Sequence, residues 1–252
     1  MRRLTLTALD GVPEIAFGDD LAKVALDALA ATGLALEEGD VLVVAQKVVS
    51  KSEGRLVLLK TVDPSAQAIE LAAITGKDPR SMELVLAESR QVLRAKRDVV
   101  VVEHRLGYVM ANAGIDQSNV AGGDAAALLL PEDPDASCER MRASLSAATG
   151  VDCGVVMNDS FGRAWRNGVV GIALGVAGMP GVVDMRGSPD RFGRALRVTQ
   201  VAVADELAAA ASLLMGQGSE GYPMVHARGV PYARRDGSMR ELLRPRAEDM
   251  FR

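Results

Sequence analysis

Short apolar runs alternate with segments of helical periodicity along this chain. Runs of strand length occupy residues 5–9, 41–45, 99–102, 108–110, 153–157 and 198–203. Between them, apolar side chains recur every three or four positions, which predicts helices over residues 21–29, 64–75, 82–93, 137–148 and 205–215. This alternation predicts a mixed α/β fold, with the first run as an edge strand.

Local signals mark the ends of several of these helices. Asp19 and Asp20 offer a side-chain cap for the first one. Asp78 and Pro79 form a cap followed by proline at the first helical position, a strong start signal. Gly150 follows the last apolar turn of the helix predicted from residue 137, so we expect that helix to end there.

The strand predicted at residues 108–110 leads into a polar stretch at residues 111–119. This stretch combines an acid, carboxamides, a hydroxyl and a glycine, among them Asn112, Gly114, Asp116, Ser118 and Asn119. Such oxygen donors are the ligands that hard cations such as Mg²⁺ take. The same residue types are also the commonest in turns, so an ordinary turn is the alternative interpretation.

A second acidic segment follows the apolar run at residues 153–157. It reads Asn158, Asp159 and Ser160, and we predict that the strand stops at Met157. Ligands of open α/β sheets sit outside the carboxyl ends of strands, which makes Asp159 a candidate functional carboxylate. Arg163 and Arg166 come next; they could grip a carboxylate or phosphate in two-pronged fashion, or pair with Asp159.

Two further features suit phosphate. Lys47 and Lys51 are four residues apart and share one side of the chain in either a helix or a strand, although a solvated face would look the same. Residues 216–221 read G-x-G-x-x-G, but they follow a predicted helix rather than a strand. We therefore reject a dinucleotide-binding Rossmann fingerprint, while the loop amides could still cradle phosphates. The sequence has no standard P-loop motif.

Composition narrows the class of protein. The chain has 252 residues, a net charge of −4 and no long basic block, so a nucleic-acid partner is not expected. The chain has only two cysteines, far apart in sequence, which argues against a disulfide scaffold. Asp10 ends the apolar part of the N-terminus too early for a signal peptide. Residues 168–183 are uncharged but short, with five glycines and a proline, so no membrane association is expected. These features favour a cytoplasmic protein.

Five segments together resemble one known family. They are Gly11-Val12-Pro13, Val48-Val49-Ser50-Lys51, Asn112-Ala113-Gly114-Ile115-Asp116-Gln117-Ser118-Asn119, Asn158-Asp159-Ser160-Phe161-Gly162-Arg163 and Leu214-Met215-Gly216-Gln217-Gly218. In this order and spacing the chain resembles coenzyme F420-0:L-glutamate ligases, the γ-glutamyl ligases, over essentially its whole length.

The resemblance implies a GTP-dependent enzyme. Members attach L-glutamate through amide bonds to coenzyme F420-0, a phospholactyl-deazaflavin, through an acyl phosphate, using Mg²⁺ or Mn²⁺, and K⁺ is a further candidate. It implies an unusual family-specific α/β fold, a single ligase unit over residues 1–252 and an intertwined homodimer. The length also allows two subdomains.

The resemblance also assigns roles to individual residues. The reaction that it implies requires no nucleophile from the protein. Metal ligands would be Asp116, Asp159, Ser160 and Gln217. Contacts to GTP would be Val12, Pro13, Glu14, Ile15, Gln46, Lys47, Lys51, Asn119, Met215, Gly216, Gln217, Gly218, Ser219, Glu220, Gly221 and Tyr222.

This chain departs from the family pattern at two places. Gln217 stands where archaeal relatives have a glutamate, and Gln46 and Lys47 stand where relatives have small hydroxyl residues. Two alternatives therefore stay open. One is a metal- and nucleotide-dependent ligase with a different carboxylate acceptor, and the other is a non-catalytic nucleotide-binding scaffold.

Overall fold

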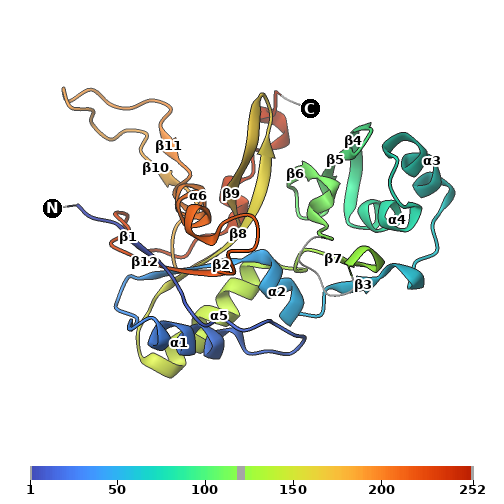
Figure 1. Ribbon diagram of the computed structural model, residues 1–252. Helices are drawn as coiled ribbons and strands as arrows, with labels where there is room; N and C mark the ends of the chain where they lie inside the picture. The colour runs from blue at the N-terminus through green and yellow to red at the C-terminus, as the bar shows by residue number, and fades with distance from the viewer. Residues whose placement is uncertain (1, 118–122, 251–252) are drawn as a thin grey trace.

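A five-stranded sheet forms the centre of the chain in the computed structural model, which describes residues 2–117 and 123–250. Its strands are ordered β1 (Thr5–Ala8), β12 (Met224–Arg228), β2 (Val41–Ala45), β8 (Gly154–Arg163) and β9 (Arg166–Ala177) (Figure 1). β2 and β8 run parallel, whereas the other neighbours are antiparallel. The predicted edge strand at the N-terminus and the strand at 41–45 are confirmed.

Helices cover both faces of this sheet. On one face α1 (Leu21–Ala31) and α5 (Pro134–Thr149) pack against buried side chains of β2 and β8, including Leu42, Val155 and Met157. On the other face lies α6 (Val203–Met215) (Figure 1). The predicted Asp20 cap and the end at Gly150 are confirmed, since Asp20 accepts two backbone N–H groups and Gly150 adopts a left-handed conformation.

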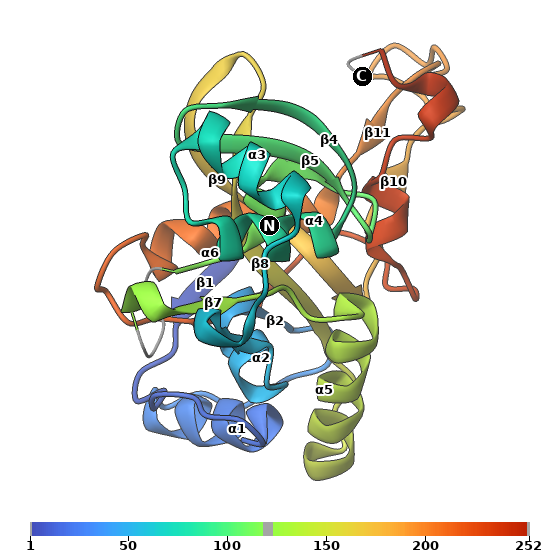
Figure 2. The ribbon, with the colours of Figure 1, turned by 90° about the vertical axis from the view of Figure 1, so that its right-hand side faces the viewer.

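A second packed unit is inserted between α2 (Gln46–Ser52) and α5. It contains α3 (Ala66–Thr75), α4 (Pro79–Ala87) and a three-stranded sheet of β4 (Ser89–Lys96), β5 (Val99–His104) and β6 (Val109–Ala111). Its own core forms between the two helices and β5, and Figure 2 looks onto this side of the molecule. The pair β3 (Leu56–Leu58) and β7 (Ala126–Leu128) joins it to the rest of the chain.

Three sequence predictions were wrong in detail, and one strand of the central sheet was not predicted. The helix predicted over residues 82–93 ends at Ala87, and Val92 and Leu93 lie in β4, which pairs with β5. At residues 198–203 only β11 (Gln200–Val201), which pairs with β10 (Val183–Asp184), is extended, because α6 already begins at Val203.

The other two errors concern the central sheet. β8 does not stop at Met157 but continues through Asp159 to Arg163, because these residues form a hairpin with β9. β12 was missed altogether within a polar, arginine-rich terminal region. No helix among the described residues combines the length and apolar character that a membrane crossing needs.

The glycine spacing of β9 allows close packing against the neighbouring helix. A Cβ atom on Gly175 would lie 2.4 Å from the carbonyl oxygen of Pro134, in the first turn of α5. We expect Gly175→Ala to lower the free energy of unfolding by about 1–3 kcal/mol, because the backbone of α5 must move away. Urea denaturation measures this change. Gly162→Ala is the control in the same hairpin, since a Cβ there meets no atom within 4 Å; an equal loss in both variants would contradict the close-packing argument.

Candidate functional site

A cavity of about 750 Å³ opens where β2 ends and β8 passes beside it. Because β2 and β8 are parallel, Ala45 pairs with Asn158, which places the start of α2 next to Asp159. Most predicted site residues line this cavity: Val12, Pro13, Glu14, Ile15, Gln46, Lys47, Lys51, Asp159, Ser160, Met215, Gly216, Gln217, Gly218, Ser219, Gly221 and Tyr222. Segments far apart in the sequence therefore converge on one site.

Three predicted residues do not line this cavity in the described structure. Asn119 lies outside the described residues. Glu220 lies in the loop but turns its carboxylate back to accept the N–H of Gly218 at 2.8 Å. Asp116 contacts the cavity through Lys47, whose Nζ lies 3.4 Å from Asp116 Oδ1.

Asp116 and Asp159 come from different units of the fold and influence each other. Backbone hydrogen bonds with Leu128 of β7 fix Asp116, while Asp159 Oδ1 accepts the N–H of Ser160 at 2.7 Å. Burial, and then the negative charge of Asp116, raises the pKa of Asp159 to about 7. Burial also raises the pKa of Asp116, against the opposing charge of Lys47. Because the two carboxylates repel each other when both are ionised, a positive charge bound near them would stabilise the site.

The residues present fit a divalent cation. Asp116 Oδ2 is buried and has no hydrogen-bond partner among the described atoms. The Ser160 hydroxyl donates to Gln217 Oε1 at 2.8 Å, so a hydroxyl and an amide oxygen lie together in the wall of the cavity that Asp159 also lines. All of these donors are oxygens, as Mg²⁺ and Mn²⁺ prefer. Within the described ranges no three or more His, Cys, Asp or Glu side chains come together in a group that could hold a metal ion. The proposed donors are therefore two carboxylates together with neutral hydroxyl and amide oxygens.

Two lysines and a glycine-rich loop form the rest of the wall. Residues 46–52 are helical, so Lys47 and Lys51 share one face of α2, and both reach the cavity. Lys51 Nζ lies 2.5 Å from Glu14 Oε1. The loop after α6 begins at Gly216 with φ of 72°, a conformation that favours glycine. Such a loop offers backbone N–H groups to phosphate without a Rossmann fold.

The two arginines after Asp159 do not line this cavity. Arg163 and Arg166 lie at the turn of the β8–β9 hairpin, and Arg163 Nη2 donates to the carbonyl of Asn167 at 3.0 Å. Sequence reasoning missed two residues with polar side chains, Gln117 and Asn158, which do line it. Their adjacency to Asp116 and Asp159 was the available signal.

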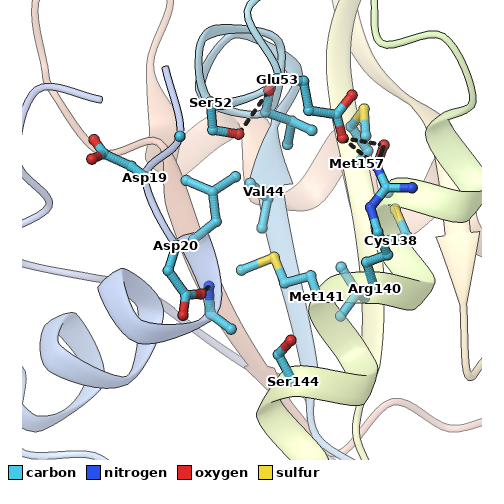
Figure 3. A pocket seen from close by; sticks show the side chains of 16 residues that line it. Asp19, Asp20, Val44, Ser52, Glu53, Cys138, Arg140, Met141, Ser144 and Met157 are labelled. Atoms are coloured by element: carbon cyan, nitrogen blue, oxygen red, sulfur yellow. Dashed lines mark hydrogen bonds and ion pairs between the residues drawn. The ribbon is translucent and has the colours of Figure 1, made fainter. Parts of the chain in front are cut away.

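A smaller cavity of about 290 Å³ lies between the start of α1, the end of α2 and α5 (Figure 3). Val44, Met141 and Met157 provide apolar side chains to its wall. Two of its charged groups, Arg140 and Glu53, are already paired, because Arg140 Nη2 lies 2.6 Å from Glu53 Oε1, and Asp19 and Asp20 accept backbone N–H groups. The larger cavity, with its unpartnered carboxylate oxygen nearby, is therefore the candidate functional site.

Comparison with known proteins gives a consistent family. The sequence model described as F420-0:Gamma-glutamyl ligase matches residues 11–229. Three similar proteins, each named coenzyme F420:L-glutamate ligase, come from Methanothermobacter thermautotrophicus, Archaeoglobus fulgidus and Natronomonas pharaonis. The first is 47% identical over 99% of both chains. The second is 43% identical over 99% of this chain and 97% of its own.

The third relative is 48% identical over 96% of this chain and 92% of its own. Identity at this level, over nearly the whole of each chain, leaves no large segment of either protein unmatched. The segments that line the cavity, from Val12 to Tyr222, lie within the residues that the family model matches. This chain belongs to the F420-0:gamma-glutamyl ligase family.

Proposed function

We propose that this protein adds L-glutamate to coenzyme F420-0 in F420 biosynthesis, using GTP and releasing GDP and phosphate. The names of its relatives support the substrates. The observation that carries the proposal is the cavity itself, in which two lysines, a glycine-rich loop and a carboxylate from β8 come together. Its volume of about 750 Å³ is large enough for a nucleotide-sized ligand.

The nucleotide would lie between α2 and the loop after α6. Lys47 and Lys51 supply positive charge on one side. On the other side lies the glycine-rich loop, whose Gly218 N–H binds the Glu220 carboxylate and would become a donor to phosphate once that carboxylate turned away. The segment Val12 to Ile15 closes the wall next to Lys51 through the Glu14 contact. In a protein of net charge −4, such local donors offset the repulsion that phosphates would otherwise meet.

The reaction proceeds in two transfers. A carboxylate oxygen of F420-0 attacks the γ-phosphorus of GTP, the bond to GDP breaks, and an acyl phosphate forms. The amine of L-glutamate then attacks the acyl carbon, phosphate leaves with the bonding electrons, and the amine loses a proton as the amide forms. Neither transfer needs a protein nucleophile, so positioning and charge stabilisation are the protein's main contributions.

Asp116, Asp159, Ser160 and Gln217 would hold the divalent metal. When bound, Mg²⁺ or Mn²⁺ would supply the positive charge that neutralises phosphate and carboxylate oxygens as they approach. We also propose K⁺ as an additional ion and a homodimer as the assembly, which a monovalent-ion series and sedimentation analysis would test.

Mass spectrometry tests the proposed function directly. The protein is incubated with GTP, Mn²⁺ or Mg²⁺, L-glutamate and the glutamate-free deazaflavin, and we expect one or more glutamyl increments with matching GDP. GDP without a glutamyl product would keep the nucleotide site but contradict the acceptor. Neither product, from folded protein, would overturn the ligase proposal in favour of a scaffold.

Gln217 offers a separate prediction about the metal. We expect Gln217→Glu to tighten Mn²⁺ binding about tenfold, because a carboxylate adds negative charge beside Asp159 and Ser160. Calorimetric titration of the nucleotide-free protein measures the affinity. Gln200→Glu, on the exposed strand β11 away from the cavity, is the control that adds the same charge elsewhere, and unchanged Mn²⁺ affinity in Gln217→Glu would remove Gln217 from the proposed ligand set.

A further inference from the structure

The glycine-rich loop after α6 holds a carboxylate of its own. Glu220 Oε2 accepts the backbone N–H of Gly218 at 2.8 Å. Hydrogen bonds from the backbone N–H groups of Glu220 itself, Gly218 and Gln217 hold the pKa of this carboxyl below its usual value. Backbone N–H groups that converge in this way form a concave anion site of the type that binds phosphate. The loop is therefore built to bind an anion, and Glu220 supplies one.

Two glycines leave the space that this carboxylate fills. Gly216 has a φ of 72°, and a Cβ atom there would overlap the carboxyl carbon of Glu220. A Cβ atom on Gly218 would lie 3.4 Å from Glu220 Oε2. Because glycine has no side chain, an anionic group can approach the loop backbone closely at both positions.

The site of the carboxylate overlaps the place proposed for the nucleotide phosphates. Residues 216–218 line the large cavity. A phosphate that accepts the N–H of Gly218 must displace the Glu220 carboxylate, because two anions that share one donor repel each other. Glu220 is exposed, so its carboxylate can turn into water without disturbing packed side chains. The two anions therefore exclude each other at this loop.

Lys51 shows a weaker form of the same arrangement. Its Nζ lies 2.5 Å from Oε1 of Glu14, whose side chain is 81% exposed. A lysine side chain is flexible and can turn from one anion to another. The N–H of Gly218 is fixed by the loop backbone and has no such freedom. Whether this N–H is available to phosphate is therefore decided by where the Glu220 carboxylate lies.

We propose that Glu220 is an internal competitor for phosphate, whose carboxylate occupies the anion site of the loop and gives way when the nucleotide phosphates bind. This inference rests on the nucleotide site of the proposed function. The affinity of a ligand for the loop falls in proportion to the fraction of time that the carboxylate leaves the loop free. Anions that contact only the loop therefore bind weakly, whereas phosphates that also contact Lys47 and Lys51 can displace Glu220. This role places Glu220 in the nucleotide site although its side chain does not line the cavity.

Calorimetric titration of inorganic pyrophosphate into the nucleotide-free protein, at fixed ionic strength, tests the inference. Glu220→Ala removes the carboxylate. Glu220→Asp keeps the charge but shortens the side chain by about 1.5 Å, which takes the oxygens out of hydrogen-bond reach of Gly218. We expect both variants to bind pyrophosphate at least about fivefold more tightly than the wild type, the gain for a loop that the carboxylate occupies about four-fifths of the time. A general effect of charge would tighten binding in Glu220→Ala alone.

Glu206→Gln is the matched control, because it removes the same charge from an exposed position in the first turn of α6, outside the cavity. It should bind pyrophosphate like the wild type. Unchanged affinity in Glu220→Asp would overturn the role of Glu220 alone, whatever the alanine variant does. If none of the four proteins bound pyrophosphate, with each folded by circular dichroism, the inference would fall together with the phosphate site on which it rests.

Discussion

Asp159→Asn is expected to lower kcat/KM for glutamate addition at least about a thousandfold. Its carboxylate lies in the wall of the large cavity and is the proposed anionic ligand beside Ser160 and Gln217. An amide of the same shape keeps the packing but lacks the charge that holds a divalent ion, and a thousandfold loss corresponds to about 4 kcal/mol of transition-state stabilisation. Steady-state GDP release together with the glutamyl product measures the change.

The same variant should be more stable than the wild type when no metal is bound. Burial and Asp116 raise the folded-state pKa of Asp159 from 3.8 to about 7. A folded carboxyl with a raised pKa stabilises the folded protein below its unfolded pKa, and this contribution is lost as pH rises from about 4 to 7. Asparagine removes that loss, so at neutral pH we expect a gain on the order of 1–2 kcal/mol.

Asp184→Asn is the control for both effects. Asp184 lies in β10, away from the cavity, and pairs with Arg186 on the surface. It should change activity less than about twofold. Full activity in Asp159→Asn would contradict the metal site, whereas lost activity with a lowered melting temperature in metal-free protein would point to misfolding instead.

The helices that the sequence predicted well carry their own boundary signals. Asp20 and Asp78 cap α1 and α4, and Gly150 ends α5, so these boundaries depend on neighbouring residues alone. The helix predicted over residues 82–93 was too long because the apolar pattern continues past Glu88, where α4 ends and the chain enters β4. A short run of apolar residues is compatible with a helix or with a strand. Residues 89–96 form a strand because they pair with β5, and this pairing is not visible in the local pattern that the prediction used.

β12 was missed because its pattern depends on its place in the sheet. It lies between β1 and β2 and buries a histidine, His226, together with three apolar residues. A histidine and an arginine within five residues do not predict a central strand. Both are accommodated here because Asp40 accepts hydrogen bonds from them, a contact across more than 180 residues of sequence.

The sequence indicated which residues belong to the candidate site, but not that the fold brings them together. Asp116 and Asp159 stood out as acids in polar segments, yet nothing near either of them indicates that they meet. They meet because the inserted unit returns through β7, whose Leu128 holds the backbone of Asp116. The family resemblance, rather than local pattern, assigned both to the metal site. The contact between Lys47 and Asp116 could be seen only in three dimensions.

Asp40→Ala is expected to lower the free energy of unfolding by about 3–5 kcal/mol, the largest stability effect we predict. The carboxylate of Asp40 is 1% exposed and lies just before β2. His226 Nε2 lies 2.7 Å from Oδ2, and Arg228 donates to both oxygens at 2.7 and 2.9 Å. Removing the carboxylate leaves the buried imidazole of His226 without its acceptor, at the place where β12 joins β2. It also takes one acceptor from Arg228, which is 35% exposed and keeps its hydrogen bonds to Glu37 and Ala35.

The pH dependence of this contribution follows from the same contacts. Burial opposes ionisation of Asp40, but hydrogen bonds from Arg228 and His226 outweigh it and hold the pKa below its usual value. A depressed folded-state pKa gives stability that is present above the unfolded pKa of about 4 and lost as pH falls further. Urea denaturation at pH 7 and pH 3 should therefore show a smaller difference between Asp40→Ala and the wild type at the lower pH.

Glu38→Ala is the matched control two residues away. Glu38 is 69% exposed and pairs with Arg234 at the surface, so its loss should cost less than about 1 kcal/mol. Asp40 is roughly 16 Å from the end of β2 that opens into the cavity. Asp40→Ala that remains folded at low temperature should therefore still bind Mn²⁺ like the wild type. If its stability loss equalled that of Glu38→Ala, the Asp40 contacts would not be what secures β12 in the sheet.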